Sequence, residues 1–227
     1  ATGKVYLKNI FNQPDLKTRL NVHRFAVNKG LMGEADIKGV WDNDLPGIRL
    51  KADIAEENLS RTRVTGFVSP KLKALDLRIE ADSTNLDLLS PYFEGIFSEF
   101  DARANGLVRL HGGFKTLDFE GGVRVKMDTK VDMINTYLQL HDDSVYISHG
   151  EFALKNARLF DREGNTGRIT GALRHTHLKN LNYHFDIQSD NLLLYYSNDP
   201  GDLLFYGKVY GIGNVTLDGG NNAMNVD

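Results

Sequence analysis

Residues 73–81 read KALDLRIEA and show the pattern that the rest of the chain repeats. Leu75, Leu77 and Ile79 fall on every second position, and charged residues stand between them. Successive side chains of a β-strand point to opposite sides of a sheet, so this period of two predicts a strand with one apolar and one charged face. The apolar face could pack into an ordinary core or line a surface that stays open.

The same alternation recurs along most of the chain and predicts an all-β fold. The turn signals between these segments are NDLPG (43–47), HGG (111–113), HDDS (141–144), REGN (162–165) and NDPG (198–201). Many short alternating segments with regular turns are typical of an antiparallel sheet. The apolar positions taken as candidate groove-lining residues are Ile48, Leu50, Ile54, Leu75, Leu77, Ile79, Val123, Val125, Val145, Ile147, Tyr183, Phe185, Ile187, Val215 and Leu217.

One segment, SPYFEGIFSEF at residues 90–100, departs from the alternation. Its phenylalanines and isoleucine recur at helical spacing. Ser90 suits the N-cap of a helix and Pro91 suits the first helical position. The segment therefore predicts one short amphipathic helix at about 91–100.

The chain also repeats itself. TGFVSPKLKALDLRIEADSTNLDLL begins at Thr65 and TGALRHTHLKNLNYHFDIQSDNLLL begins at Thr170, so that Gly66 aligns with Gly171; a fainter copy surrounds Gly39. Each unit reads as a turn-forming glycine, a short strand, a loop and a longer strand. Such a unit cannot bury its own apolar face and must stack on its neighbours. The repeats predict one elongated domain over residues 1–227.

Composition excludes several classes of function. A net charge of -3 offers no electrostatic attraction to nucleic acid. The chain has no cysteine, so disulfides and thiolate metal sites are excluded. No apolar run is long enough to span a membrane as a helix, and no signal peptide opens the chain, as expected of a fragment of a longer protein.

The search for reactive groups finds no catalytic arrangement. His175, His177 and His184 have a spacing that can hold zinc or nickel, but solvent-facing polar positions on half-buried strands explain them better. DREGN (161–165) reads as a hairpin turn rather than a calcium loop. No nucleophile stands beside a plausible base. We therefore expect no enzyme activity, no cofactor and no metal.

The order of motifs after residue 85 resembles the C-terminal domain of the TamB family, within the wider AsmA-like group and in the style of its Bacteroidota members. Before that residue the similarity lies only in the repeat character. No single motif is specific, and the resemblance lies in their order. The elements that carry it are Asn135-Thr136-Tyr137, Asp161, Gly164-Asn165, Gly171, His175, Asn191-Leu192-Leu193-Leu194, Phe205-Tyr206-Gly207, Gly211 and Gly213.

The resemblance implies a curved β-sheet, a taco or gutter, with an apolar inner face. It implies a periplasmic segment of a protein that an N-terminal helix, not present here, anchors in the inner membrane. The inner face would shield lipid acyl chains or unfolded outer-membrane protein strands between the two membranes. The full-length protein would work with an outer-membrane partner of the Omp85 class. The family supplies no catalytic residues.

Two other classes of protein remain as alternatives. A β-sandwich binding or adhesion module would use the same one-faced strands in a compact shape, and an enzyme could assemble its site from distant residues. Unpaired strands at the ends of an open sheet would also favour an edge-to-edge homodimer. Shape discriminates the gutter from the sandwich, because only the gutter is elongated.

Overall fold

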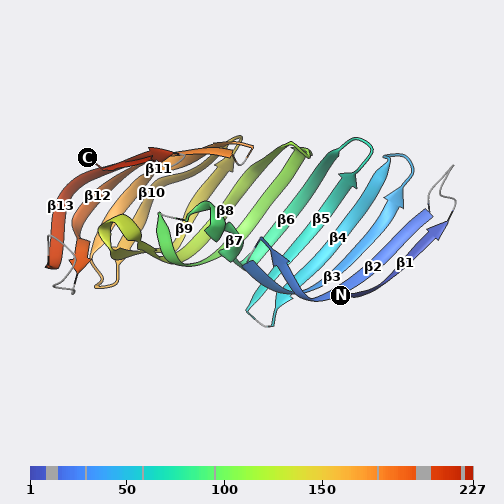
Figure 1. Ribbon diagram of the computed structural model, residues 1–227, viewed down its shortest axis with the longest axis horizontal. Coiled ribbons are helices and arrows are strands. Elements are labelled where there is room, and N and C mark those ends of the chain that lie inside the picture. Colours follow the sequence, from blue (N-terminus) through green and yellow to red (C-terminus); the bar gives the residue numbers. More distant parts are fainter. Residues whose placement is uncertain are drawn as a thin grey trace.

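The computed structural model describes residues 1–8, 15–28, 30–57, 59–94, 96–177, 179–197, 206–220 and 223–226. Within them the chain forms one sheet of fourteen antiparallel strands in sequence order, which follow one another along the long axis of the molecule (Figure 1). The predicted all-β antiparallel fold is confirmed, and it is one sheet rather than the two packed sheets of a sandwich. The strands are β1 (Thr2–Lys8), β2 (Asp15–Val27), β3 (Gly30–Asp42), β4 (Gly47–Glu56), β5 (Ser60–Ser69), β6 (Ala74–Asn85), β7 (Phe97–Gly113), β8 (Thr116–Val131), β9 (Thr136–Ser148), β10 (Glu151–Asp161), β11 (Thr166–Thr176), β12 (Lys179–Ser197), β13 (Gly207–Gly220) and β14 (Ala223–Val226).

The predicted helix at about 91–100 is wrong. A 3-10 helix, η1 (Asp87–Tyr92), ends where that helix should begin, and β7 begins at Phe97 after a short turn. Ser90 is no N-cap, since its hydroxyl donates to the carbonyl of Asp87 at 2.7 Å. Phe97 pairs with Val131 in the β7–β8 ladder. Strand pairing thus overrides the local helical spacing, as tertiary contacts often do. Gly95 lies outside the described residues.

Two of the predicted turn signals form turns and two do not. NDLPG connects β3 to β4 and REGN connects β10 to β11. HGG lies inside β7, and HDDS lies inside β9, where Asp142 has a φ of 73° at a β-bulge. Residues that tolerate positive φ serve bulges as well as turns, which is why these signals mislead. NDPG lies outside the described residues.

The glycines of the sequence repeat lie within strands and do not form turns. Gly66 pairs with Leu77, and Gly171 pairs with Phe185. Their φ angles are 149° and 154°, and a Cβ at either position would lie 2.1 Å from a carbonyl oxygen of the neighbouring strand. Glycine is needed here because the backbone is in a conformation that other residues rarely adopt. The two copies nevertheless occupy equivalent places in the ladder.

The register of the strands defines two faces of the sheet, because directly paired residues of an antiparallel ladder share a face. We call the face that carries Leu50, Leu77 and Phe185 the front face and the opposite one the back face. Pairs link Leu50 through Gly66 to Leu77, and Val145 through Leu154 and Gly171 to Phe185. The same chains of pairs place all fifteen candidate groove residues on the front face.

The sheet bends toward its front face along one rim, which carries the β6–β7 and β8–β9 connections with η1 and η2 (Asp132–Ile134). Ladder irregularities lie near this bent rim in β6, β7, β10 and β12, and such bulges bend strands. The bend brings β12 close to β9 and to η2, although neither is its sheet neighbour. The side-chain amide of Asn135 donates to the carbonyl of Tyr196 at 2.5 Å across this gap.

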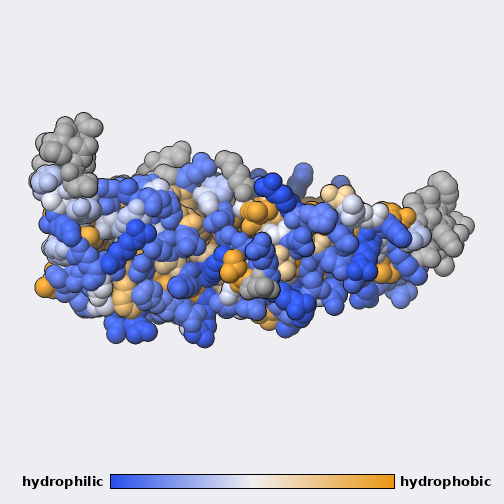
Figure 2. Space-filling model, turned by 90° about the horizontal axis from the view of Figure 1, so that it is seen from below, coloured by the Kyte–Doolittle hydropathy of each residue, from blue (hydrophilic) through white to orange (hydrophobic). Residues whose placement is uncertain are grey.

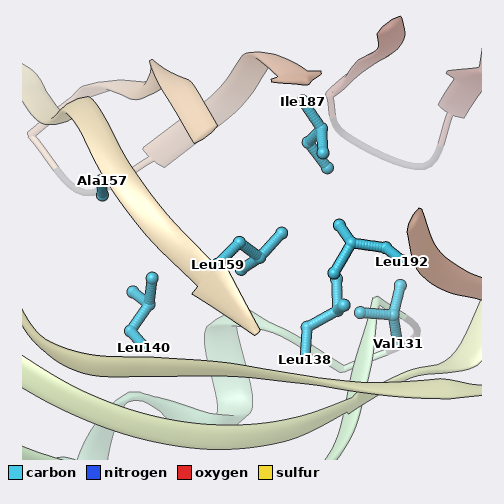
Figure 3. Packing of buried hydrophobic residues seen from close by; sticks show 7 residues of the cluster. All are labelled: Val131, Leu138, Leu140, Ala157, Leu159, Ile187 and Leu192. Carbon is cyan, nitrogen blue, oxygen red and sulfur yellow. The ribbon is translucent and has the colours of Figure 1, made fainter. Parts of the chain in front are cut away.

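Two clusters of buried front-face residues form under the bent rim. The N-terminal cluster consists of Met32, Ala35 and Ile54, with Leu88 of η1 packed against it. Figure 3 shows the C-terminal cluster, in which Ile187 of β12 points toward Leu159 of β10. Its buried members are Val131, Leu138, Leu140, Ala157, Leu159, Ile187 and Leu192.

Candidate functional site

The fifteen candidate groove residues fall into two groups by burial. Ile54 and Ile187 belong to the buried clusters, Val215 and Leu217 pack against the C-terminal cluster, and Val125 is buried. The other ten are half-buried on the front face, and we call them the front strip. They are Ile48, Leu50, Leu75, Leu77, Ile79, Val123, Val145, Ile147, Tyr183 and Phe185.

The front strip runs across the strands from β4 to β12. These nine strands are separated by eight spacings of about 4.8 Å, so the strip extends over roughly 40 Å. Leu110, Phe119, Phe152 and Leu173 lie on the same face by register and fill positions between the predicted residues. Leu110 was not predicted because it directly precedes HGG, which was read as a turn, and Phe152 because a bulge breaks the alternation after it. Strict alternation counted within each short segment would have found them.

The back face carries a ladder of exposed ion pairs. Arg109 donates to both carboxylate oxygens of Asp76, at 2.7 and 2.8 Å, and this hydrogen bonding lowers the pKa of Asp76. Arg63 lies 3.3 Å from both Asp53 and Glu80. On the side of the molecule seen in Figure 2, hydrophilic residues likewise predominate, with hydrophobic residues in patches between them. Exposed pairs of this kind add little stability, about 0–1 kcal/mol each, but they keep this face wet.

Two hollows of about 460 and 550 Å³ open mainly on the back face. Asp76 and Arg78 line both of them. The charged residues that line them are already ion-paired, so neither hollow offers the unpaired charged groups that a specific ligand would need. The evidence for a groove on the front face is therefore the strand register and the partial exposure of the apolar residues, and these hollows add nothing to it.

Of the three histidines that the sequence groups together, His177 stays close enough for its charge to act on His175, whereas His184 lies apart from them. His175 is buried against Phe152, with ring centroids 5.0 Å apart, so the expectation that it faces solvent is wrong. Burial lowers the pKa of His175, as do the charges of His177 and His149. His184 lies on the back face, where its Nδ1 atom donates a hydrogen bond to the carboxylate of Asp218 at 2.6 Å, and this bond raises the pKa of His184. In the described part of the chain no three His, Asp or Glu residues come together as a metal site.

Three acidic side chains, and no basic one, stand at paired front-face positions from β3 to β13 of the described ladder. Two of them are satisfied at the bent rim. Glu56 lies 3.2 Å from Arg103, and Asp161 accepts hydrogen bonds from four N–H groups. The third, Asp143 of β9, pairs in register with Val125 and lies one front position from Val145 of the front strip.

Comparison with known proteins gives no relative from which a function could be transferred. No protein-family model, curated protein or solved structure matches the chain. The resemblance to the TamB family therefore stays a prediction based on the order of motifs. Among the described residues, neither helix has the length and apolar character needed to cross a membrane.

Proposed function

We propose that the chain is a non-catalytic periplasmic bridge segment whose front face forms an apolar groove for lipid acyl chains in transit between the inner and outer membranes. The observation that supports this proposal is the front strip, whose ten half-buried apolar residues lie on β4, β6, β8, β9 and β12, with further apolar residues of the same face on β7, β10 and β11 between them. Burial of apolar surface contributes about 25 cal/mol per Å². A cargo that covers the partly exposed strip therefore gains this free energy on binding. The full-length protein would meet an Omp85-class partner at the outer membrane.

Backbone chemistry favours acyl chains over unfolded outer-membrane protein strands as the cargo. The inner strands of the sheet already pair on both sides, so a polypeptide laid along the front strip would find no free backbone partners. Unpaired amide groups removed from water cost about 1–3 kcal/mol each. An acyl chain has no such groups and loses nothing by lying on an apolar surface.

The test is to purify the chain and identify bound molecules by native mass spectrometry and lipid extraction. We expect acyl lipid to copurify with the wild-type chain and to be lost from the Leu77→Asp and Phe185→Asp variants, because both place a charge in the front strip. The matched control is Leu107→Asp. Leu107 is exposed on the back face, so this variant should keep the lipid.

Three outcomes would count against the proposal. A wild-type chain that neither copurifies with lipid nor takes up a fluorescent fatty acid would refute the groove. Copurifying peptide in place of lipid would favour outer-membrane protein strands as the cargo. Equal loss of lipid in Leu107→Asp would show that the effect of the charge is not specific to the front strip. Melting curves of all variants establish that each remains folded.

A further inference from the structure

Asp143 is an acidic residue on an otherwise apolar part of the front face, and one of its carboxylate oxygens lacks a hydrogen-bond partner among the described residues. This atom, Oδ2, is also shielded from solvent. The neighbouring front-face positions are Val125, Val145 and Ala104, none of which can donate a hydrogen bond from its side chain. A carboxylate in such surroundings costs free energy unless a donor or a cation reaches it.

No other residue of the described sheet supplies that donor. Asp142 and Ser144, its chain neighbours, lie at the bulge and on the back face, and Asp142 is itself ion-paired with Arg124. A metal ion is a poor candidate, because one carboxylate provides too few ligands for calcium or magnesium. A group from outside the sheet can satisfy Asp143 if it is compact enough to reach a half-buried site.

We propose that Asp143 is a specificity site that binds the primary ammonium group of an amphiphile whose chain lies on the front strip. An ammonium group supplies three N–H donors and a positive charge on a compact head. Its chain would run over Val145 and the adjoining apolar residues. An anionic head would be repelled, and a quaternary ammonium would lack the N–H donors that Oδ2 requires. The inference rests on the proposed function, since it assumes that the front strip carries acyl chains.

The test compares three probes that share one chain length, namely decylamine, decanol and decanoate. Their binding to the full chain is measured by isothermal titration calorimetry at neutral pH, below their micelle concentrations. We expect decylamine to bind about tenfold more tightly than decanol, the value of one charge-assisted hydrogen bond, and decanoate to bind more weakly than either. Asp143→Asn should abolish this ranking and leave decanol binding unchanged.

The neighbouring carboxylate provides the matched control. Asp142→Asn removes a charge one residue away, outside the front-face ladder, and should keep the preference for decylamine. A second variant, Asp143→Val, places the same residue type as Val145 at this position and should also lose the preference for decylamine. Agreement of the two variants shows that the loss does not come from a folding defect in Asp143→Asn.

Each remaining outcome has one meaning. Binding of decanol with no preference for decylamine refutes the role of Asp143 but leaves the groove intact. Preference retained in both Asp143 variants, or lost in Asp142→Asn, also refutes it. Failure of every probe to bind refutes the proposed function itself. If an amphipathic peptide containing lysine binds through Asp143 where decylamine does not, the ligand is a protein strand and the proposal is wrong.

Discussion

At the scale of single residues, Asp161 joins the β10–β11 turn to β12 by hydrogen bonds. Its carboxylate accepts hydrogen bonds from the backbone N–H groups of Glu163, Asn165 and Leu193, each at 2.9 Å, and from the side chain of Asn165 at 2.8 Å. Burial raises the pKa of Asp161, but these donors outweigh it and leave the pKa below its ordinary value. The turn is thus held by a charge that must stay ionised.

Replacement of Asp161 by alanine should lower the free energy of unfolding by about 3 kcal/mol at neutral pH, because four donors lose an ionised acceptor. A group whose folded-state pKa is depressed stabilises the fold above its unfolded pKa of about 3.9 and loses that contribution as the pH falls through the folded value. Urea unfolding should therefore show the difference between wild type and variant shrinking below about pH 4. Asp190→Ala, at an exposed carboxylate, should change stability by less than about 0.5 kcal/mol.

His175 and His184 should give stability opposite dependences on pH. The pKa of buried His175 is lowered, so the unfolded chain binds more protons and stability falls as the pH drops below about 6.5. The pKa of His184 is raised by Asp218, so its contribution is present below about 6.5 and is lost as the pH rises through the folded value. Melting temperatures measured from pH 5 to 8 should flatten on the acid side in His175→Gln and on the basic side in His184→Gln. Parallel profiles for the two variants would contradict this assignment.

At the scale of the strands, Gly66 and Gly171 allow neighbouring strands to approach closely at equivalent places in the repeat. Gly66→Ala and Gly171→Ala should each cost about 2 kcal/mol or more, because the added Cβ meets a backbone oxygen at 2.1 Å and the φ angle is positive. Gly122→Ala is the control, since its Cβ would find its nearest neighbour at an ordinary 3.6 Å. Chemical denaturation of the three variants measures the difference. A loss in Gly122→Ala as large as in the other two would contradict the steric explanation, because alanine at an unstrained position reduces the entropy of the unfolded chain and should not destabilise the fold.

The sequence predicts the strands and their faces well because alternation is a local property. Leu75, Leu77 and Ile79 needed no knowledge of their neighbours to be placed on one face. Bulges are harder to predict than strands. One extra residue shifts the alternation, and no strong residue preference marks the position of the bulge. Leu154 and Ala157 share the front face although they are three residues apart. The same cause hid the position of Asp143, which lies beside the bulge that HDDS forms.

At the scale of the whole molecule, what could not be predicted is which strands the bend of the sheet brings together. The helical spacing of Phe93 and Phe97 suggested one helix, yet Phe97, the first residue of β7, packs against the C-terminal cluster, while Leu88 of η1 packs against the N-terminal cluster. The segment from Leu88 to Phe97 thus contacts both clusters, and only the bend of the sheet sets the distance between them. Local sequence does not encode this bend because it arises from bulges in strands far apart in the chain.

The two clusters also predict that the molecule unfolds in parts. Most tertiary contacts join neighbouring strands, as in repeat proteins, so a local defect should spread only to nearby strands. Leu192→Ala in the C-terminal cluster should lower local stability by about 2–5 kcal/mol and speed amide hydrogen exchange in β9–β12 while leaving β3–β5 protected. Ile54→Ala in the N-terminal cluster should do the reverse, and Leu72→Ala, at a side chain 60% exposed, should do neither. Hydrogen exchange followed by mass spectrometry resolves the two regions. If either core variant speeds exchange evenly along the sheet, the clusters form one cooperative unit and the front face is coupled from end to end.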